Sequence, residues 1–192
     1  MRILIPILIL CLISCTNQKP SQTSYWETQK SNFKYQDRTE FLIDSAFRTS
    51  YKQLPKANYK LFSKTVDNRI YLYSWQNRNK KYNEFTVIRD NGEHGLQIYY
   101  CILDKKDSLI SSTQIAGRGG EGGFLFEKRS KFLSRDSLLN IASVTLMHNS
   151  EQNLKMPIGD TTFSYMLFGK GGKIKEKKFR EVNELQYDKI IE

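Results

Sequence analysis

The chain has 192 residues and carries 30 Lys and Arg against 20 Asp and Glu, a formal net charge of +10. That length suits a single domain with its own core, and the positive excess indicates either a solvated lysine-rich surface or an anionic partner. Three cysteines and two histidines argue against a disulfide framework and a structural zinc site.

The chain opens with a short apolar segment. Arg2 precedes an apolar run over residues 3–13. A membrane-spanning helix needs about 20 apolar residues, so this run is too short to cross a bilayer. A basic residue followed by such a run is typical of a secretion signal.

The end of this segment reads Leu12-Ile13-Ser14-Cys15, which resembles the lipobox of bacterial lipoproteins. The resemblance implies that residues 1–14 are a signal peptide, that Cys15 is lipidated through a thioether, and that its new amino group is acylated, typically with palmitate. Two or more acyl chains anchor a protein stably to a membrane. We therefore expect a lipid-anchored protein of the cell envelope, on the outer membrane and facing the periplasm.

The polar, aperiodic stretch after Cys15 predicts a flexible tether over residues 15–36. Residues 37–192 are then expected to form a single β-rich domain. The expected partners are the membrane, through the lipid anchor, and an envelope protein, a glycan or an anionic lipid. Nucleic acid is not expected outside the cytoplasm.

The start of the domain shows a helical spacing of apolar residues, which predicts one N-terminal helix over about 37–54. Asp37 and Glu40 form a capping pair in this interpretation, and Pro55 ends the helix. The residues on the apolar face are Ile43, Phe47, Tyr51 and Leu54.

From about residue 58 the period changes to two, which is typical of strands. Turn signals at Asp90-Asn91-Gly92 and at residues 104–107 separate them. Short connections join antiparallel neighbours, so the expected fold is mainly β: an antiparallel meander of about eight or nine strands, closed into a barrel or folded as a sandwich. The predicted strands are 58–66, 70–75, 85–88, 95–103, 108–116, 124–126, 137–148, 162–168 and 174–182.

A glycine-rich segment over residues 117–123 is the first candidate ligand site. Gly119 and Gly120 would let the backbone approach a ligand. Arg118 would clamp a carboxylate or phosphate, and Glu121 would accept a hydrogen bond from a sugar hydroxyl. The alternative is a flexible or bulged hairpin connection.

Aromatic side chains suggest a second candidate site. In an extended strand Tyr71, Tyr73 and Trp75 share one face, which would form a platform for stacking sugars or peptides. The alternative is that this face belongs to the core.

The C-terminal hairpin is basic, with six basic and two acidic residues from Lys170 to Glu181. These charges either lie against an anionic surface or keep an edge strand from aggregating. Its turn, Gly169-Lys170-Gly171-Gly172-Lys173, would also suit a phosphate. Cys101 lies in an apolar stretch and is expected to be a small buried hydrophobe.

These patterns predict a non-catalytic binding or structural domain, with no catalytic residues, metal ligands or cofactor assigned. The alternative is a lipid-anchored hydrolase of envelope glycan or lipid polymers, with Arg118, Glu121 or His94 in a pocket near the glycine-rich segment.

Overall fold

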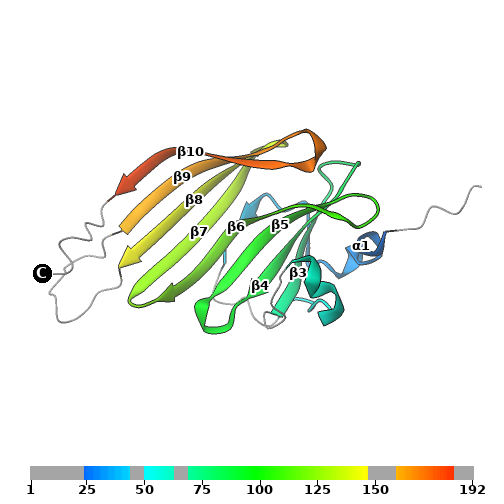
Figure 1. The fold of residues 1–192 in the computed structure, drawn as a ribbon, viewed down its shortest axis with the longest axis horizontal. Coiled ribbons are helices and arrows are strands. Elements are labelled where there is room, and N and C mark those ends of the chain that lie inside the picture. The colour runs from blue at the N-terminus through cyan, green and yellow to red at the C-terminus, as the bar shows by residue number, and fades with distance from the viewer. Residues whose placement is uncertain (1–23, 44–49, 63–68, 147–158, 184–192) are drawn as a thin grey trace, which may run out of the picture.

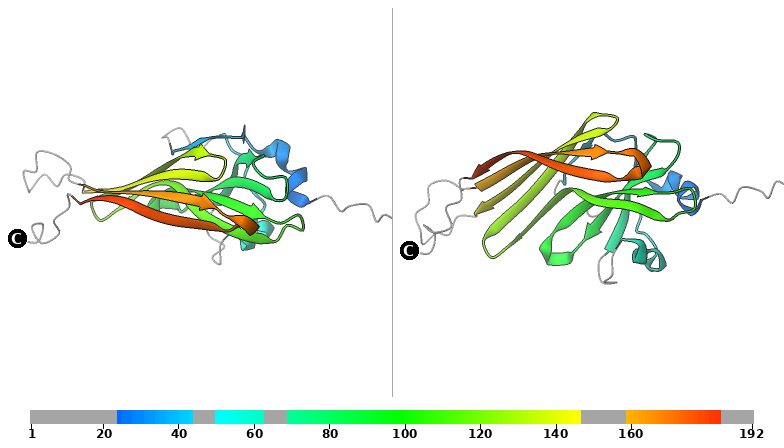
Figure 2. Two further views of the ribbon diagram at one scale, coloured as in Figure 1. Left: turned by 90° about the horizontal axis from the view of Figure 1, so that it is seen from above. Right: turned by 45° about the horizontal axis from the view of Figure 1, so that its top comes forward.

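The computed structural model describes residues 24–43, 50–62, 69–146 and 159–183, which form one sheet of ten strands (Figure 1). The strands follow in the order β1-β3-β4-β5-β6-β7-β8-β9-β10, and β2 lies against β7. The prediction of a mainly β, antiparallel fold is confirmed, and the one small α-helix near the N-terminus is α1 rather than the helix expected over 37–54. The sheet is open rather than closed into a barrel, and Figure 2 shows its twist from two further sides.

The strands from β3 to β10 form an antiparallel meander, as their alternating sequence predicts. The bounds are α1 (Tyr25–Thr28), β1 (Tyr35–Gln36), β2 (Glu40–Phe41), β3 (Arg69–Gln76), β4 (Asn83–Asp90), β5 (Leu96–Leu103), β6 (Leu109–Glu121), β7 (Phe124–Ser134), β8 (Ser137–Leu146), β9 (Gly159–Phe168) and β10 (Ile174–Asn183). Short 3-10 helices span Lys30–Asn32, Lys56–Leu61, Gly92–His94 and Lys170–Gly172.

Strand β6 joins two parts of the sheet. Its residues 109–118 pair with β5, whereas only residues 117–121 pair with β7. The freed side of β7 is taken by β2, where Phe41 pairs with Ser130. The segment from β1 to β2 thus runs from the edge beside β3 to the middle of the sheet. We call strands β7–β10 the wing.

The N-terminal segment belongs to the folded domain, so the expected boundary at residue 37 lies too late. Trp26 in α1 and Phe33 after it are 1% and 5% exposed. Ser24 accepts a hydrogen bond from the Glu27 backbone N–H and donates to Asp107 in the β5–β6 turn. Of the expected tether, residues 24–36 are therefore packed, and residues 15–23 lie outside the described residues.

The helix predicted over 37–54 is not formed in its described part. Glu40 and Phe41 form a strand, and residues 52–54 run alongside β3, where the Leu54 N–H donates to the Ile70 carbonyl. Asp37 has a positive φ of 50° and accepts two hydrogen bonds from Asn77, so it caps no helix. Pairing with distant strands overrides the local helical period. Phe47 lies outside the described residues.

The strand predicted over 58–66 is also wrong in its described part. Residues Lys56–Leu61 form a 3-10 helix instead. Pro55 is the N-cap of this 3-10 helix and does not end a preceding helix as expected. This turn places the ring of Tyr59 in the core, where its hydroxyl accepts a hydrogen bond from Gln53. Residues 63–66 lie outside the described residues.

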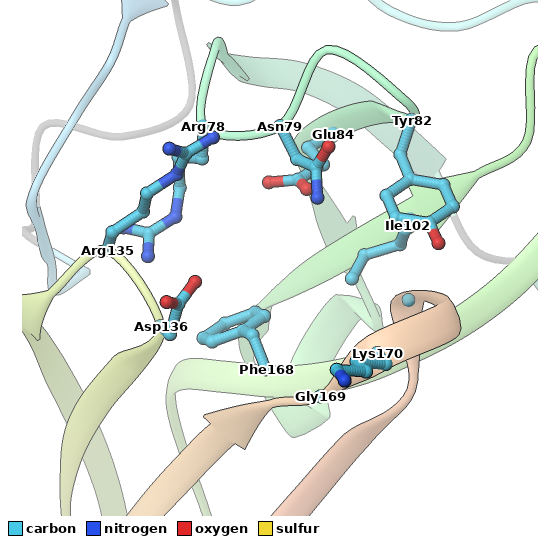
Figure 3. A pocket seen from close by; sticks show the side chains of 11 residues that line it. Arg78, Asn79, Tyr82, Glu84, Ile102, Arg135, Asp136, Phe168, Gly169 and Lys170 are labelled. Atoms are coloured by element: carbon cyan, nitrogen blue, oxygen red, sulfur yellow. The ribbon is translucent and has the colours of Figure 1, made fainter.

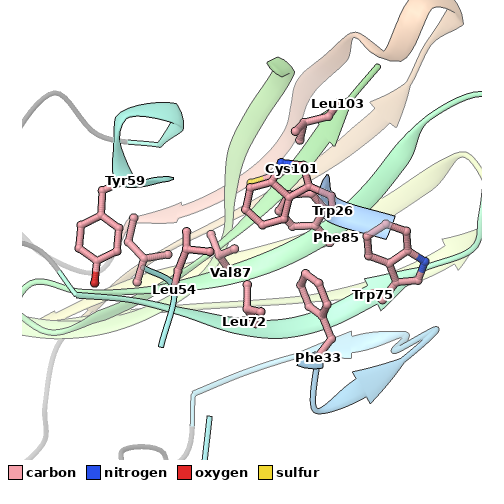
Figure 4. Packing of buried hydrophobic residues seen from close by; sticks show 11 residues of the cluster. Trp26, Phe33, Leu54, Tyr59, Leu72, Trp75, Phe85, Val87, Cys101 and Leu103 are labelled. Atoms are coloured by element: carbon pink, nitrogen blue, oxygen red, sulfur yellow. The ribbon is translucent and has the colours of Figure 1, made fainter. Parts of the chain in front are cut away.

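Strands β3–β5 are covered on both faces. One face packs on the N-terminal segment, where the Phe85 ring stacks on Trp26 at 4.4 Å between ring centroids (Figure 4). The opposite face packs on β2 and on the wing, with Phe41 and Tyr100 fully buried. The first cluster comprises Trp26, Phe33, Leu54, Tyr59, Ile70, Leu72, Trp75, Phe85, Val87, Cys101 and Leu103. Because both faces are covered, residues 95–103 carry apolar side chains at both alternating sets of positions.

Candidate functional site

The glycine-rich segment is not a loop. Residues 117–121 complete β6, and only Gly122 and Gly123 form the turn to β7, both with positive φ. Arg118, Gly120 and Glu121 are exposed. Glu121 Oε2 lies 3.7 Å from His94 Nδ1, and both side chains are largely exposed. A cavity at the other end of the sheet is lined by other residues.

Two of these glycines have a packing role. A Cβ atom at Gly119 would collide with the carbonyl oxygen of His94, and one at Gly95 would collide with the carbonyl oxygen of Arg118. The end of β6 therefore lies directly against the β4–β5 turn, backbone on backbone. This geometry favours the hairpin interpretation of the segment over a ligand cradle.

The aromatic row is divided between the two faces of β3. A β-bulge between Leu72 and Ser74 adds one residue to the strand, so Tyr73 and Trp75 point to opposite sides. Trp75 packs in the cluster on the N-terminal side, whereas Tyr73 and the partly buried Tyr71 pack on the other side. The three rings therefore form no common platform. Tyr73 and Trp75 are buried, as the alternative that this face belongs to the core predicted.

A cavity of about 220 Å³ opens where three turns of the meander meet (Figure 3). The turns are β3–β4, β7–β8 and β9–β10, which lie at one end of the sheet because they follow alternate strands of an antiparallel meander. The lining residues are Arg78, Asn79, Tyr82, Glu84, Ile102, Arg135, Asp136, Phe168, Gly169, Lys170 and Gly172.

Arg78 is held at one side of this cavity by aromatic packing. Its guanidinium carbon lies 3.5 Å from the ring centroid of Phe132 and 5.3 Å from that of Phe168. Its Nη2 donates to the carbonyl oxygen of Ser134 at 3.1 Å. A guanidinium has five N–H donors in a fixed plane, so the fixed side chain keeps donors for a ligand. Arg135 lines the same side of the cavity (Figure 3).

Glu84 lies at the back of the cavity and is 5% exposed. Its Oε2 accepts a hydrogen bond from the hydroxyl of the fully buried Tyr100 at 2.7 Å. Burial raises the pKa of Glu84, and the Tyr100 hydrogen bond and the charge of Arg78 only partly oppose this effect. Glu84 is therefore engaged by Tyr100 behind the cavity, and its carboxyl is easier to protonate than an exposed one.

The third wall is the β9–β10 turn. Gly171 and Gly172 have positive φ, and the Gly169 N–H donates to the Lys173 carbonyl at 2.9 Å. A Cβ at Gly172 would lie 3.1 Å from a methyl carbon of Ile102, so glycine lets the turn lie against β5. The hairpin interpretation of this turn is confirmed, and the structure also brings Lys170 to the cavity that holds Arg78.

A wider hollow adjoins the cavity and shares Asn79 and Tyr82 with it. Lys30, Lys80 and Lys105 line it, together with Glu27, which pairs with Lys105 at 2.8 Å. The turn end of the sheet therefore presents more cationic than anionic side chains around both openings.

Sequence reasoning missed this cavity because its charged residues stand singly in three separate turns. The one local indication of the cavity was the turn Gly169-Lys170-Gly171-Gly172-Lys173, whose sequence suits a phosphate. Cys101 is fully buried and burial raises its pKa to about 12, as expected of a small apolar side chain. Cys15 and His148 lie outside the described residues.

In the described part of the chain, no group of three or more His, Cys, Asp or Glu side chains is arranged to hold a metal ion. None of its helices has the length and apolar character needed to span a membrane. Comparison with known protein families, with curated proteins and with solved structures finds no match for this chain.

Proposed function

We propose that the chain is a lipid-anchored lipoprotein of the cell envelope whose β domain binds an anionic ligand without catalysis. The anchor is Cys15, on the outer membrane facing the periplasm. The observation that carries the binding role is the fixed guanidinium of Arg78 in a cavity that Arg135 and Lys170 also line.

The chemistry of the cavity supports a carboxylate or phosphate group as the part of the ligand that is bound. Planar guanidinium groups match both anions with paired hydrogen bonds. The aromatic packing of Arg78 reduces the entropy that its side chain would lose on binding. Of the acidic residues in the cavity, Glu84 is engaged by Tyr100 and has a raised pKa, which leaves Asp136 as the exposed carboxylate.

The anchor is tested by replacing Cys15. In the Cys15→Ala variant we expect no incorporation of labelled palmitate, and recovery of the chain in the soluble fraction rather than with membranes. Cys101→Ala is the matched control, because that thiol is buried, and it should keep the label. Labelling that persists in Cys15→Ala would refute the anchor.

The binding role is tested with inorganic phosphate as the probe, by following backbone amide resonances of the unlipidated chain from residue 15 with Cys15→Ala. We expect shifts at Arg78, Asp136 and Lys170 that saturate. Charge-assisted hydrogen bonds contribute about 1.5–3 kcal/mol, so Arg78→Gln should weaken binding about 10- to 150-fold.

Arg118→Gln is the matched control for phosphate binding, since Arg118 is exposed and lines neither the cavity of Arg78 nor the hollow beside it. It should leave the affinity unchanged. Arg135→Gln is a second cavity variant that leaves the packing of Arg78 on Phe132 intact. If neither cavity variant weakens phosphate binding, or if Arg118→Gln abolishes it, the proposed site is wrong.

A further inference from the structure

One face of the wing is apolar and partly exposed. In the register of β8, β9 and β10, Leu139 lies opposite Tyr165, and Ile141 lies opposite Phe163. Phe179 sits in a bulge of β10 and stacks on Tyr165 at 4.4 Å between ring centroids, with the planes 15° apart. Phe179 and Leu167 are 47% and 45% exposed. The apolar wing face comprises Leu139, Ile141, Phe163, Tyr165, Leu167 and Phe179.

Cations surround this face. On β10, Lys175 pairs with Leu167 and Lys177 with Tyr165, so both lysines project to the apolar wing face. Arg180 lies over the Phe163 ring at 5.4 Å. On β7, Arg129 and Lys131 pair with Ile141 and Leu139. The charge of Lys131 is partly neutralised by Glu40, whose Oε1 lies 2.5 Å from Lys131 Nζ.

The acidic residues of β10 project to the opposite face. Glu176 accepts hydrogen bonds there from Asn140 and Ser164, both buried. Glu181 forms an ion pair with Lys178 at 2.6 Å, and Lys178 is paired with Ser164. The charges of the strand are thus segregated: Lys175, Lys177 and Arg180 surround the apolar wing face, and the glutamates are kept from it.

Protection of the edge strand accounts for only part of this pattern. Exposed lysines on β10 would discourage pairing with another sheet. They do not explain why Leu167 and Phe179 are half exposed on the same face. Apolar and aromatic side chains inside a ring of lysine and arginine are the composition by which protein surfaces insert into the headgroup region of an anionic membrane.

We propose that the apolar wing face docks on the surface of an anionic lipid membrane, with Phe179 and Leu167 entering the headgroup region and the surrounding cations contacting phosphates. The proposal uses the envelope setting of the proposed function but not the lipid on Cys15. A hollow of about 230 Å³ at the β7 side of this face, lined by Leu42, Leu139 and Ile141, extends the apolar surface.

Charge decides between a membrane and a second copy as the occupant. Stacking two copies through this face would bring Lys175, Lys177 and Arg180 of each copy against those of the other, and like charges at close range are unfavourable. An anionic leaflet instead attracts each of them, with an attraction that salt weakens. The N-terminal segment is compatible with this contact: eight residues lie between Cys15 and Ser24, and the distance between these two residues is at most about 30 Å.

The test is cosedimentation of the unlipidated chain from residue 15, carrying Cys15→Ala, with vesicles of phosphatidylcholine alone or with phosphatidylglycerol. We expect binding only with phosphatidylglycerol, and less binding in high salt. An attraction of about 1 kcal/mol for each lysine near the surface predicts about 30-fold weaker binding for Lys175→Ala with Lys177→Ala. Leu167→Ser with Phe179→Ser should also weaken binding.

The control variants carry the same changes elsewhere on the surface. Lys105→Ala with Lys106→Ala removes two exposed lysines, and Leu109→Ser changes a leucine that is 36% exposed. Both should bind as the parent chain does. The proposal is overturned if phosphatidylglycerol vesicles bind no chain, or if all variants bind equally. It is also overturned if the parent chain is a dimer that Phe179→Ser dissociates, which would assign the face to a second copy.

Because the chain in this test lacks the lipid, its outcome is independent of acylation at Cys15. If the parent chain takes up no palmitate while the unlipidated chain binds vesicles, the anchor is wrong and the docking face stands. If the parent chain is labelled at Cys15 and the unlipidated chain binds no vesicles, the anchor stands and the docking face is wrong. The phosphate probe separates them further, since Arg78→Gln should leave vesicle binding unchanged.

Discussion

Trp26→Ala is expected to destabilise the domain by about 3–5 kcal/mol, a loss typical of a fully buried aromatic ring cut back to a methyl group. The Trp26 ring is 1% exposed and stacks on Phe85 while meeting Phe62 edge-on at 5.7 Å. Its removal would leave a cavity between the N-terminal segment and β4. Denaturant unfolding at equilibrium measures the loss as a lower midpoint.

Tyr25→Ala is the matched control for this prediction. Tyr25 neighbours Trp26 in α1, is 37% exposed, and accepts one exposed hydrogen bond from Asn58. Its replacement should cost about 1 kcal/mol or less, as is usual for surface positions. Equal effects of the two substitutions, or a loss of less than 1 kcal/mol for Trp26→Ala, would mean that residues 24–36 are a tether after all.

The position of Trp26 changes the expected anatomy of the chain near the membrane. A tether that ended at residue 36 would let the domain move well away from the bilayer. With Ser24 bound to Asp107 and Asn83, the segment left between Cys15 and the domain is short. The domain is therefore expected to stay close to the surface that the lipid on Cys15 would enter.

The strands were predictable because their signal is local. Alternation and turn residues mark most of β3 to β10, although β7 was marked only at residues 124–126 and β6 only to residue 116. Their short connections allow only antiparallel neighbours. The β4–β5 and β5–β6 turns form as the sequence suggests: Asp90 accepts from the Gly92 N–H, and Asp104 from the Lys106 and Ser108 N–H groups. Such turns are specified by side chains within a few residues of one another.

The errors have a common physical origin in contacts between distant parts of the chain. Phe41 is buried because it pairs with Ser130, a partner that no periodicity in residues 37–54 could reveal. The bulge in β3 moves Trp75 to the opposite face from Tyr73, and strict alternation cannot show an inserted residue. The cavity was unpredictable for the same reason, since Arg78, Arg135 and Lys170 meet only through the topology.

The glycine-rich segment shows how composition alone misleads. Its glycines were compatible with a ligand cradle and with close packing, and only the position of the β4–β5 turn distinguishes the two. Gly119 lies against the His94 backbone, whereas Gly122 has nothing within 4 Å of the place where a Cβ would be. The same residue type thus serves packing at one position and turn conformation at another.

Gly119→Ala is accordingly expected to cost about 1–3 kcal/mol or more, because the added methyl group would force β6 away from the turn and overpacking is costly. Gly122→Asn is the matched control: the position has a φ of 58°, which asparagine tolerates, so the loss should be below about 1 kcal/mol. Denaturant midpoints of the two variants measure the difference. If Gly119→Ala is as stable as Gly122→Asn but loses phosphate binding, the segment is a ligand site and the packing interpretation is wrong. If it is destabilised while keeping the phosphate affinity of the parent chain, the ligand belongs to the cavity of Arg78, at the other end of the sheet.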